Sequence, residues 1–470
     1  MDGHAIMVSF HLQGHIIPFV NLALKLASKG FSITFAHLDF VHQQISQSQR
    51  NPTQTDIFAA ARSSGLDIRY TTFSDGFPLD FDRDGANFDQ YVEYYRDGFP
   101  DIVDQLVAKI LHSHPSTAAS NYFLIADTFS VWPEKIAKRY GLVNVSFWTE
   151  PALVFSLYYH LELLRGKGHV PVDGRREMVD YVPGVDSINT KDFMSYLHDT
   201  ELEVIHDVIF RAFDAVKSAD FILCNTVEEL EADTISALQQ KQPFYAIGPL
   251  FPANNSIAKS LMPEADSADW LNSRPPGSVL YVSFGSLATT DRSVIHEIAG
   301  GLLLSEVNFM WVIRPGMVNS GGGVLPEGFE DTTRKRGLMV PWCSQNEVLR
   351  NPAIGGFLTH CGWNSILESV WCGVPMICYP LFTDQITNRK LVVDDWKVGI
   401  NLCEGEGIIN KEEVAEKIEF VMSEERSEEL RQQMEKVRRT LENATSVDGS
   451  SNRNFDGFVE DVCHEIFRRQ

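Results

Sequence analysis

The feature that most constrains the fold is an alternation of short apolar runs with longer amphipathic ones, which occurs twice along the chain. In the first half, strands are expected at residues 6–10, 31–38, 123–126, 143–148, 221–225 and 244–247. Helices are expected between them, among them 18–29, with Pro18 at its start, and 131–140. Strands alternating with helices predict a parallel sheet covered by helices on both faces.

After a polar, aperiodic stretch at 251–262 the alternation begins again. Strands are expected at residues 279–284, 309–313, 338–340, 356–358 and 376–379. Helices are expected at residues 293–304, 363–372, 385–396, 411–423, 428–443 and 454–468. The second half therefore predicts another α/β unit of the same kind.

The length of 470 residues exceeds what one compact core usually holds and suits two domains of roughly 200 residues each. We predict a first domain at 1–250, a linker at 251–262, a second domain at 263–450, and a terminal helix at 451–470 that packs back on the first domain. The fold class is α/β, with two doubly wound, Rossmann-like domains facing each other across a cleft. Ligands of such sheets bind beyond the carboxyl ends of the strands.

The net charge and the cysteine content restrict the binding partners and the cellular location that we expect for this chain. A formal net charge of -23 argues against nucleic acid and anionic membrane surfaces as partners. The 7 cysteines are odd in number and include no Cys-x-x-Cys pair, so neither zinc nor a disulfide framework is expected. Reduced thiols, with no expected signal peptide or membrane span, predict a cytoplasmic location.

One segment of the second half resembles a binding site for a diphosphate. Gly362 permits a tight turn after a strand, and the backbone N–H groups of the following helix form an anion site. Asn364 and Ser365 add side-chain donors, His360 adds another, and Glu368, one turn on, suits the two hydroxyls of a ribose. The alternative is an ordinary capped helix beside a structural histidine.

The surroundings of this segment resemble the signature box of plant UDP-glycosyltransferases, glycosyltransferase family one. That box opens with Trp-Cys/Ala-x-Gln and closes with Asp-Gln; here it begins at Trp342 and ends at Gln385, 44 residues inclusive. The opening Gln-Gly-His-Ile-Ile-Pro-Phe-Val also resembles plant subfamily eighty-six. The resemblance implies a GT-B fold and a hexosyltransferase that uses UDP-glucose as co-substrate, without a cofactor or metal.

The resemblance also implies a donor-binding set. Its uridine-binding members are Trp342, which stacks on the uracil, Gln345 and Glu368. Its diphosphate-binding members are Ser286, His360, Asn364 and Ser365. The residues expected to contact the sugar are Thr149, Trp363, Asp384 and Gln385, and Gly14, Cys343 and Gly362 complete the set. The alternatives are a core position for Trp342 and a helix cap for Asp384.

A catalytic pair is expected in the first half. His15 lies in a predicted loop between a strand and a helix, and Asp127 ends a strand of the same predicted sheet. A histidine suits removal of a proton from a hydroxyl when a partner orients its other ring nitrogen. A lone histidine in a loop is more often structural, but the Gly-His-x-x-Pro pattern and the strand-end aspartate both resemble the family. His11 departs from the family pattern; packing is its expected role, and acceptor binding the alternative.

These residues predict an inverting glucosyltransferase that acts on a hydroxyl (or carboxyl) of a small apolar metabolite such as a terpenoid or phenolic. A dinucleotide-dependent oxidoreductase is disfavoured because no Gly-x-Gly-x-x-Gly follows a strand. A non-catalytic nucleotide-sugar-binding protein is the main alternative, and retention of both His15 and Asp127 argues against it. The acceptor, the use of other UDP-sugars and the oligomeric state stay open.

Overall fold

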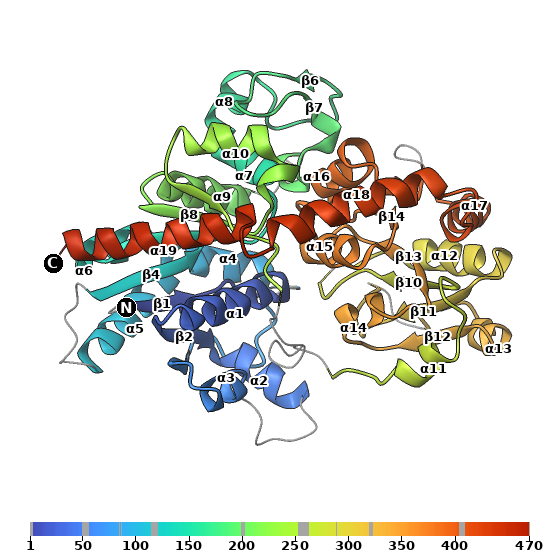
Figure 1. Ribbon diagram of the computed structural model, residues 1–470, viewed down its shortest axis with the longest axis horizontal. Coiled ribbons are helices and arrows are strands. Elements are labelled where there is room, and N and C mark those ends of the chain that lie inside the picture. The colour runs from blue at the N-terminus through green and yellow to red at the C-terminus, as the bar shows by residue number, and fades with distance from the viewer. Residues whose placement is uncertain are drawn as a thin grey trace. The chain divides into compact units, whose positions relative to one another are not determined.

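The computed structural model describes residues 3–48, 56–83, 85, 87–113, 121–198, 203–251, 263–287, 289–318, 323–403 and 409–469. The chain divides into two compact units. The first comprises Met1–Lys191, Tyr196–Met262 and Ala444–Gln470, and the second comprises Asp192–Ser195 and Pro263–Asn443. Each unit contains a parallel sheet flanked by helices, which confirms the predicted fold class (Figure 1).

The sheet of the first unit has 7 parallel strands in the order β3-β2-β1-β4-β5-β8-β9. Their bounds are β1 His4–Val8, β2 Ser32–Leu38, β3 Ile68–Phe73, β4 Tyr122–Asp127, β5 Val143–Trp148, β8 Phe221–Cys224 and β9 Phe244–Ala246. The order reverses direction between β1 and β4, as in a doubly wound Rossmann-like sheet. All the strands predicted for the first half are present, whereas β3 was not predicted.

The helices of this unit cover the sheet. They are α1 Gln13–Ser28, α2 Asp39–Ser48, α3 Ala59–Ser63, α4 Phe88–Asp97, α5 Phe99–Ser113, α6 Pro133–Tyr140, α7 Ala152–Tyr159, α8 Leu161–Gly166, α9 Glu203–Val216, α10 Ala232–Gln239 and α19 Ser450–Arg468. Short elements complete the unit: the antiparallel pair β6 Met178–Val179 and β7 Ile188–Asn189, and the 3-10 turns η3 Thr190–Asp192, η4 Ser195–Leu197 and η5 Glu228–Leu230.

The start of α1 differs from the prediction. We predicted a loop at His15 and a helix from Pro18, but the helix begins at Gln13, so His15 lies in its first turn and Pro18 lies inside it. The backbone N–H groups of His15 and Ile16 both donate to the Leu12 carbonyl and begin the helix. Pro18 removes only the bond to the carbonyl four residues earlier, close to the exposed helix start, so the loss is tolerated.

The sheet of the second unit has 6 parallel strands in the order β12-β11-β10-β13-β14-β15. Their bounds are β10 Val279–Ser283, β11 Asn308–Val312, β12 Gly337–Val340, β13 Ile354–Thr359, β14 Met376–Cys378 and β15 Gly399–Asn401. The helices are α11 Ala268–Asn272, α12 Arg292–Leu304, α13 Phe329–Thr333, α14 Gln345–Leu349, α15 Trp363–Cys372, α16 Gln385–Lys390 with the π-helical η6 Leu391–Asp395, α17 Lys411–Met422 and α18 Glu428–Ala444. This sheet is doubly wound as well, with its reversal between β10 and β13.

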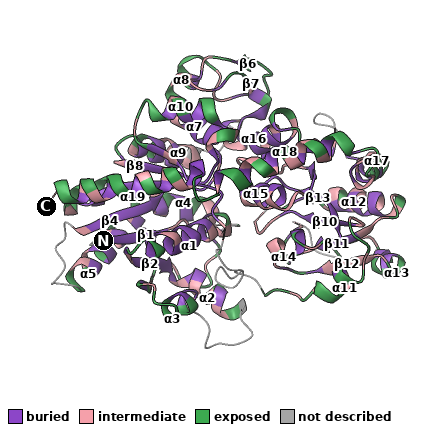
Figure 2. Cartoon of the chain, in the orientation of Figure 1, coloured by how far each residue is buried: buried purple, intermediate pink, exposed green. Residues whose placement is uncertain are grey.

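Each unit has its own hydrophobic core, and the interior strands of both sheets are buried in Figure 2. Apolar residues of α19 contribute to the core of the first unit: Phe455, Phe458, Val459, Val462 and Ile466. The chain enters the first unit again at Ala444, earlier than the predicted boundary at 450. Most of the predicted linker, residues 252–262, lies outside the described residues. No helix within the described ranges has the length and apolarity that crossing a membrane would require.

The two reversals of strand order position the residues of interest. In the first unit, Val8 of β1 pairs with Ala126 of β4, so the segments leading to His15 and Asp127 leave the same edge of the sheet. In the second unit, Ser283 of β10 pairs with Thr359 of β13, so Ser286 and His360 follow neighbouring strand ends. Crevices at such reversals are where doubly wound sheets bind ligands.

Candidate functional site

His15 and Asp127 form a direct pair in the first unit. The Nδ1 atom of His15 lies 2.8 Å from Oδ2 of Asp127, and both side chains are buried. The other carboxylate oxygen of Asp127 accepts the backbone N–H of Phe129 at 3.0 Å. A carboxylate can only accept, so Nδ1 carries the proton and Nε2 is left with the lone pair that a base requires.

The surroundings of the His15 ring are aromatic on one side and polar on the other. The rings of Phe10 and Phe129 lie 5.4 and 5.8 Å from it, centroid to centroid. The hydroxyl of Thr149, which we predicted to contact the donor sugar, lies 3.2 Å from Nδ1. Oε1 of Glu150, which the sequence analysis did not single out, lies 3.9 Å from Nε2. Gly14 is exposed in the same helical turn.

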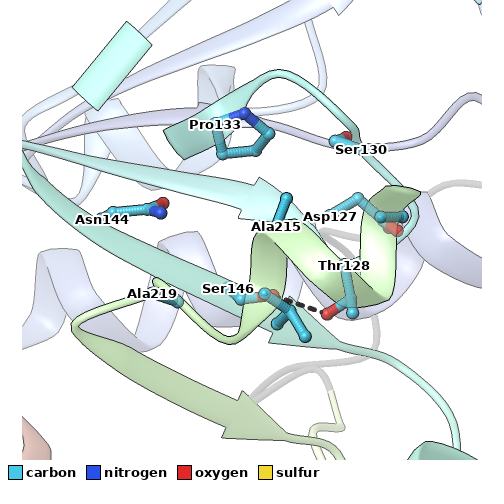
Figure 3. A pocket seen from close by; sticks show the side chains of 10 residues that line it. Asp127, Thr128, Ser130, Pro133, Asn144, Ser146, Ala215 and Ala219 are labelled. Atoms are coloured by element: carbon cyan, nitrogen blue, oxygen red, sulfur yellow. Dashed lines mark hydrogen bonds between the residues drawn. The ribbon is translucent and has the colours of Figure 1, made fainter. Parts of the chain in front are cut away.

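A small cavity lined by both polar and apolar side chains lies beside Asp127, between β5 and α9 (Figure 3). Thr128 and Ser146 share a hydrogen bond of 2.7 Å at its wall, and Asn144 lines it further along β5. About 10 Å³ is open to the centre of a water molecule, roughly the space one water needs. The cavity thus has room for a solvent molecule but not for a substrate.

His11 packs among aromatic rings. It is buried, and its ring lies 4.5 Å from that of Phe10, 5.7 Å from Phe40 and 5.3 Å from Tyr91. The ring contacts with Phe40 and Tyr91 are edge-on, a favourable arrangement for aromatic side chains. These contacts agree with a packing role.

In the second unit, His360 fits between two glycines. A Cβ atom at Gly285 would lie 2.4 Å from Nε2 of His360, and one at Gly362 would lie 2.6 Å from it. Gly285 also has a φ of 75°, which side chains rarely adopt. Ser286 follows Gly285 and is half-buried. Glycines at these two positions therefore let the strand ends close around the imidazole.

His360 is neutral at physiological pH. Burial lowers its pKa to about 4; a hydrogen bond with the Ser283 backbone opposes this, and the cation of Arg314 lowers the pKa further. Arg314 is itself buried, and its Nε donates to the carbonyl of Gly285 at 3.2 Å. The neutral ring has a single N–H, which it can give either to the Ser283 backbone or to a ligand, while Arg314 supplies positive charge near the same ring.

Helix α15 begins at the end of β13, as predicted. Trp363 and Ser365 are buried in its first turn and Asn364 is half-buried between them. The ring of Trp363 packs on that of Trp396, 5.8 Å away. Gly362 is the N-cap and gives no side-chain bond to the helix, so the first N–H groups point to whatever lies before it.

Gln345 and Glu368 form a pair beside this helix. Nε2 of Gln345 donates to Oε2 of Glu368 at 2.7 Å and to Oγ of Ser365 at 2.9 Å. Burial raises the pKa of Glu368 to about 7, and the bond from Gln345 and the charge of Arg350 oppose this rise only in part. Because Ser365 accepts from Gln345, its own hydroxyl hydrogen can be donated to a ligand.

Two residues shortly before Gln345, Trp342 and Cys343, are buried. Trp342 is 9% exposed, and its carbonyl accepts the N–H of Ala265 at 2.9 Å. The thiol of Cys343 lies 3.4 Å from the hydroxyl of Tyr281. Burial raises the pKa of the Cys343 thiol to about 12. A ligand would therefore meet a protonated thiol or the backbone of Cys343, never a thiolate.

The loop that ends the signature box is ordered by its own side chains. Asp384 accepts the hydroxyl of Thr383 at 2.7 Å and Nδ2 of Asn388 at 2.5 Å. Gln385 is buried, and its Oε1 accepts the N–H groups of Leu381 and Phe382 at 3.0 and 3.2 Å. Both lone pairs of this oxygen are used, so Gln385 keeps only N–H groups for a ligand, whereas we expected it to offer both a donor and an acceptor.

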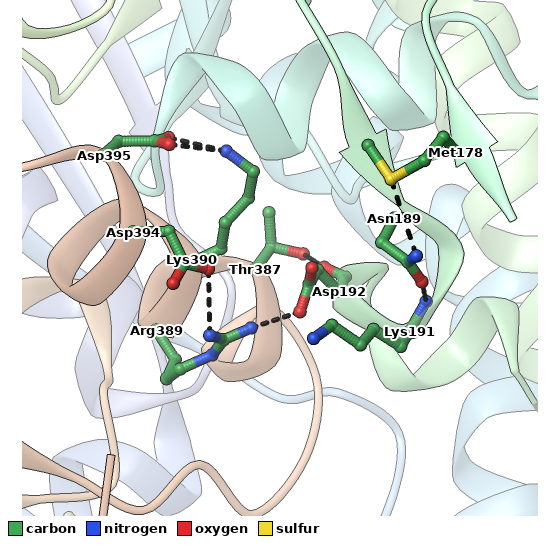
Figure 4. A network of polar contacts seen from close by, with 9 residues as sticks. All are labelled: Met178, Asn189, Lys191, Asp192, Thr387, Arg389, Lys390, Asp394 and Asp395. Carbon is green, nitrogen blue, oxygen red and sulfur yellow. Dashed lines mark hydrogen bonds and ion pairs between the residues drawn. The ribbon is translucent and has the colours of Figure 1, made fainter. Parts of the chain in front are cut away.

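A distant segment of sequence holds this loop, and the sequence analysis did not foresee it. The backbone N–H of Thr383 donates to Oγ of Ser195 at 2.7 Å, and the N–H of Ser195 donates back to the Thr383 carbonyl at 3.0 Å. Thr387 donates to the Asp192 carbonyl at 2.7 Å, and Arg389 forms an ion pair with the Asp192 carboxylate (Figure 4). Asp192–Ser195 is therefore part of the second unit.

Among the described residues, no group of three or more His, Cys, Asp or Glu side chains is placed to hold a metal ion. The polar groups gathered in the second unit are donors suited to an anion and one carboxylate suited to hydroxyls. The pair in the first unit is suited to proton removal.

Comparison with known proteins identifies the family. The family model described as UDP-glucoronosyl and UDP-glucosyl transferase matches residues 251–437. UDP-glycosyltransferase 86A1 of Arabidopsis thaliana is 54% identical over 98% of this chain and 95% of its own length. The chain belongs to the plant UDP-glycosyltransferases. UDP-glycosyltransferase 86A2 of the same plant, 48% identical with the same coverage, supports membership of subfamily eighty-six.

A solved structure shows the same architecture for this glycosyltransferase. Phytolacca americana UGT2, complexed with UDP-2fluoro-glucose and pterostilbene, aligns with a TM-score of 0.81 at 26% identity, covering 98% of this chain and 100% of that one. The fold is therefore GT-B, with two Rossmann-like units, as the resemblance implied.

Proposed function

We propose that this glycosyltransferase moves glucose from UDP-glucose to a hydroxyl (or carboxyl) of a small apolar plant metabolite such as a terpenoid or phenolic, with inversion at the anomeric carbon. The observation that carries the proposal is the 2.8 Å contact of His15 with Asp127, which leaves Nε2 as a base. Phe10 and Phe129 beside the ring favour an apolar acceptor. The complex of Phytolacca americana UGT2 with UDP-2fluoro-glucose supports glucose as the sugar.

In the proposed reaction, His15 takes the proton of the acceptor hydroxyl, and Asp127 stabilises the imidazolium that forms. The acceptor oxygen attacks the anomeric carbon from the face opposite UDP, and the bond to the β-phosphate oxygen breaks with its electrons leaving on UDP. A single displacement inverts the configuration at that carbon.

The donor-binding roles predicted from the sequence are part of the proposal. Ser286, His360, Asn364, Ser365 and the N–H groups of α15 would meet the charge that develops on the diphosphate, where fixed donors are most effective. We propose that these donors, without a metal ion, are sufficient. Trp342, Gln345 and Glu368 would bind the uridine; Asp384 and Gln385 would bind the sugar. A cytoplasmic location is proposed with them, since all the cysteines are free thiols.

The test is a screen of plant phenolics and terpenoids with UDP-glucose, with products identified by mass spectrometry and the anomeric configuration by proton NMR. We expect β-glucosides, and activity that survives EDTA. An α-linked product would refute the single displacement, and loss of activity that Mg²⁺ restores would refute metal independence. UDP-glucose binding without transfer to any acceptor would favour a binding protein instead.

A further inference from the structure

Glu150 lies beside the nitrogen of His15 that the proposed reaction uses. It follows β5 and Thr149, and its Oε1 is 3.9 Å from Nε2 of His15. The side chains of Glu150 and His15 are only 13% and 9% exposed. Asp127 occupies the other nitrogen, so the imidazole has a carboxylate near each end. The 3.9 Å separation is too long for a hydrogen bond, so Nε2 keeps its lone pair for a substrate.

Capping of α7 does not account for this carboxylate. Glu231 already satisfies the start of that helix: its carboxylate accepts the N–H groups of Ala152 and Leu153 at 3.0 and 2.8 Å. The backbone carbonyl of Glu150, and not its side chain, accepts the thiol of Cys224 at 3.4 Å.

The carboxylate adds negative charge where the acceptor reacts. An acceptor oxygen in contact with Nε2 shares the surroundings of that nitrogen with Oε1 of Glu150, in a partly desolvated setting where charges interact strongly. The charge of Glu150 also acts on a neighbouring thiol, that of Cys224. The pKa of this thiol is raised mainly by burial and further by the charges of Glu231 and Glu150. A hydroxyl can donate or stay neutral there, whereas an ionised carboxyl group is repelled.

Resting on the proposed function, we propose that Glu150 is a specificity-determining residue that admits neutral hydroxyl acceptors and excludes carboxylates, so that the products are O-glucosides and not glucose esters. The proposed function allows either a hydroxyl or a carboxyl group to accept the glucose, and the role of Glu150 restricts the acceptor to a hydroxyl. Because Glu150 acts on the acceptor's charge, its removal changes the choice between acceptors and not the binding of UDP-glucose.

The experiment uses two probes that differ only in the reacting group, 2-naphthol and 2-naphthoate. Binding by naphthalene fluorescence and kcat/KM with UDP-glucose are measured for the wild type, Glu150→Gln and Glu150→Ala. Glu162→Gln is the matched control, because that side chain is 83% exposed on α8. We expect Glu150→Gln to bind 2-naphthoate about tenfold more tightly, as expected for removal of one close like charge, with little change for 2-naphthol.

The outcomes separate this inference from the function on which it rests. An unchanged naphthol-to-naphthoate ratio in both Glu150 variants would overturn the role of Glu150 and leave the transferase intact. An equal loss of kcat/KM for both probes would also overturn it, since Glu150 would then act in catalysis or folding. Failure of the wild type to bind either probe would refute the acceptor site at His15 itself, and with it the proposed function.

Discussion

Two histidines lie at the proposed sites, and their surroundings give them different chemistry. His15 has a carboxylate on Nδ1, so its imidazolium would be stabilised when Nε2 takes a proton. His360 is enclosed between glycines, and burial lowers its pKa to about 4. The first ring can cycle its charge during a reaction, whereas the second stays neutral above about pH 5 and has a single N–H to give to the Ser283 backbone or to a ligand.

Glu368 is the group in the proposed donor site whose charge changes near neutral pH. Its pKa is raised from 4.5 to about 7 by burial, and only the ionised form can accept from both ribose hydroxyls. We predict that UDP-glucose affinity rises about tenfold from pH 6 to pH 8, following the ionised fraction of one such group. Calorimetry with UDP-glucose measures this; UDP itself is unsuitable because its terminal phosphate titrates in the same range.

The Glu368→Gln variant should bind UDP-glucose more weakly at pH 8 and show no such slope. The raised pKa of Glu368 changes the free energy of unfolding with pH in the opposite direction to the affinity for UDP-glucose. The folded carboxyl holds its proton more tightly than the unfolded one, so this group stabilises the free protein below about pH 4.5 and loses that contribution as pH rises through 7. A UDP-glucose affinity that is flat in the wild type would remove Glu368 from the ribose site.

Gln385 can be tested by a substitution that separates its two functions. Gln385→Glu keeps an oxygen for the N–H groups of Leu381 and Phe382 and removes the amide donor proposed to meet the sugar. We predict that kcat/KM for UDP-glucose falls about tenfold, the usual effect of one hydrogen bond lost to a buried polar group. Affinity for UDP, which has no sugar, should change little. An equal fall in UDP affinity would mean that the residue only holds the loop.

At the scale of elements, the loop before α16 depends on a segment nearly two hundred residues earlier in the chain. Ser195 accepts the N–H of Thr383, whose φ of 57° is unfavourable for a side chain. The next residue, Asp384, is one of the two proposed to read the sugar. The position of its carboxylate therefore depends on a bond that no local sequence pattern encodes.

Ser195→Ala removes the acceptor for the Thr383 N–H. We predict a KM for UDP-glucose raised about fivefold, the equivalent of one net hydrogen bond of roughly 1 kcal/mol, with little change in kcat. Steady-state kinetics at saturating acceptor measures this. Ser278→Ala is the control, since the Ser278 hydroxyl, in the same unit, donates to the carbonyl of Pro275 three residues earlier at 2.7 Å. A loss in kcat equal to the rise in KM would contradict a positioning role.

The elements that the sequence predicted are those with a strong local signal. The predicted strands lie in the interior of the sheets or are continuous apolar runs, such as β4 and β13, which are buried throughout. The strand β3 was missed because it is an edge strand with alternating exposure, and β15 because its Gly-Ile-Asn sequence, also at a sheet edge, is not a continuous apolar run. The start of α1 was misplaced because Pro18 was taken as the first helical residue.

For the sites, sequence motifs predicted the residues but not their partners. The contact between His15 and Asp127 could be expected because both follow neighbouring strands of one sheet. Glu150 carries no motif, and its place near Nε2 is visible only once β5 and α1 are packed. Asp192 and Ser195 could not be found by periodicity, since their partners on the Asp384 loop come from the far end of the chain.

At the scale of the whole molecule, the proposed base and the proposed donor site belong to different compact units. His15 and Asp127 are in the first, whereas Trp342, His360 and Glu368 are in the second. Each unit has its own hydrophobic core. Proton removal and donor binding should therefore be lost separately.

We predict that His15→Ala lowers kcat by about 10²–10⁴-fold, the usual contribution of a general base, while its affinity for UDP-glucose stays within error of the wild type. Asp127→Asn should also be severely impaired, because the imidazolium loses its charged partner.

Trp342→Ala should instead affect donor binding: it should weaken the binding of UDP and of UDP-glucose alike by about 1–3 kcal/mol if the indole stacks on the uracil. Calorimetry and single-turnover kinetics on the same three variants distinguish the two effects. A His15→Ala enzyme with more than about a tenth of the wild-type rate would disprove the base, and unchanged UDP affinity in Trp342→Ala would return that residue, only 9% exposed, to the core.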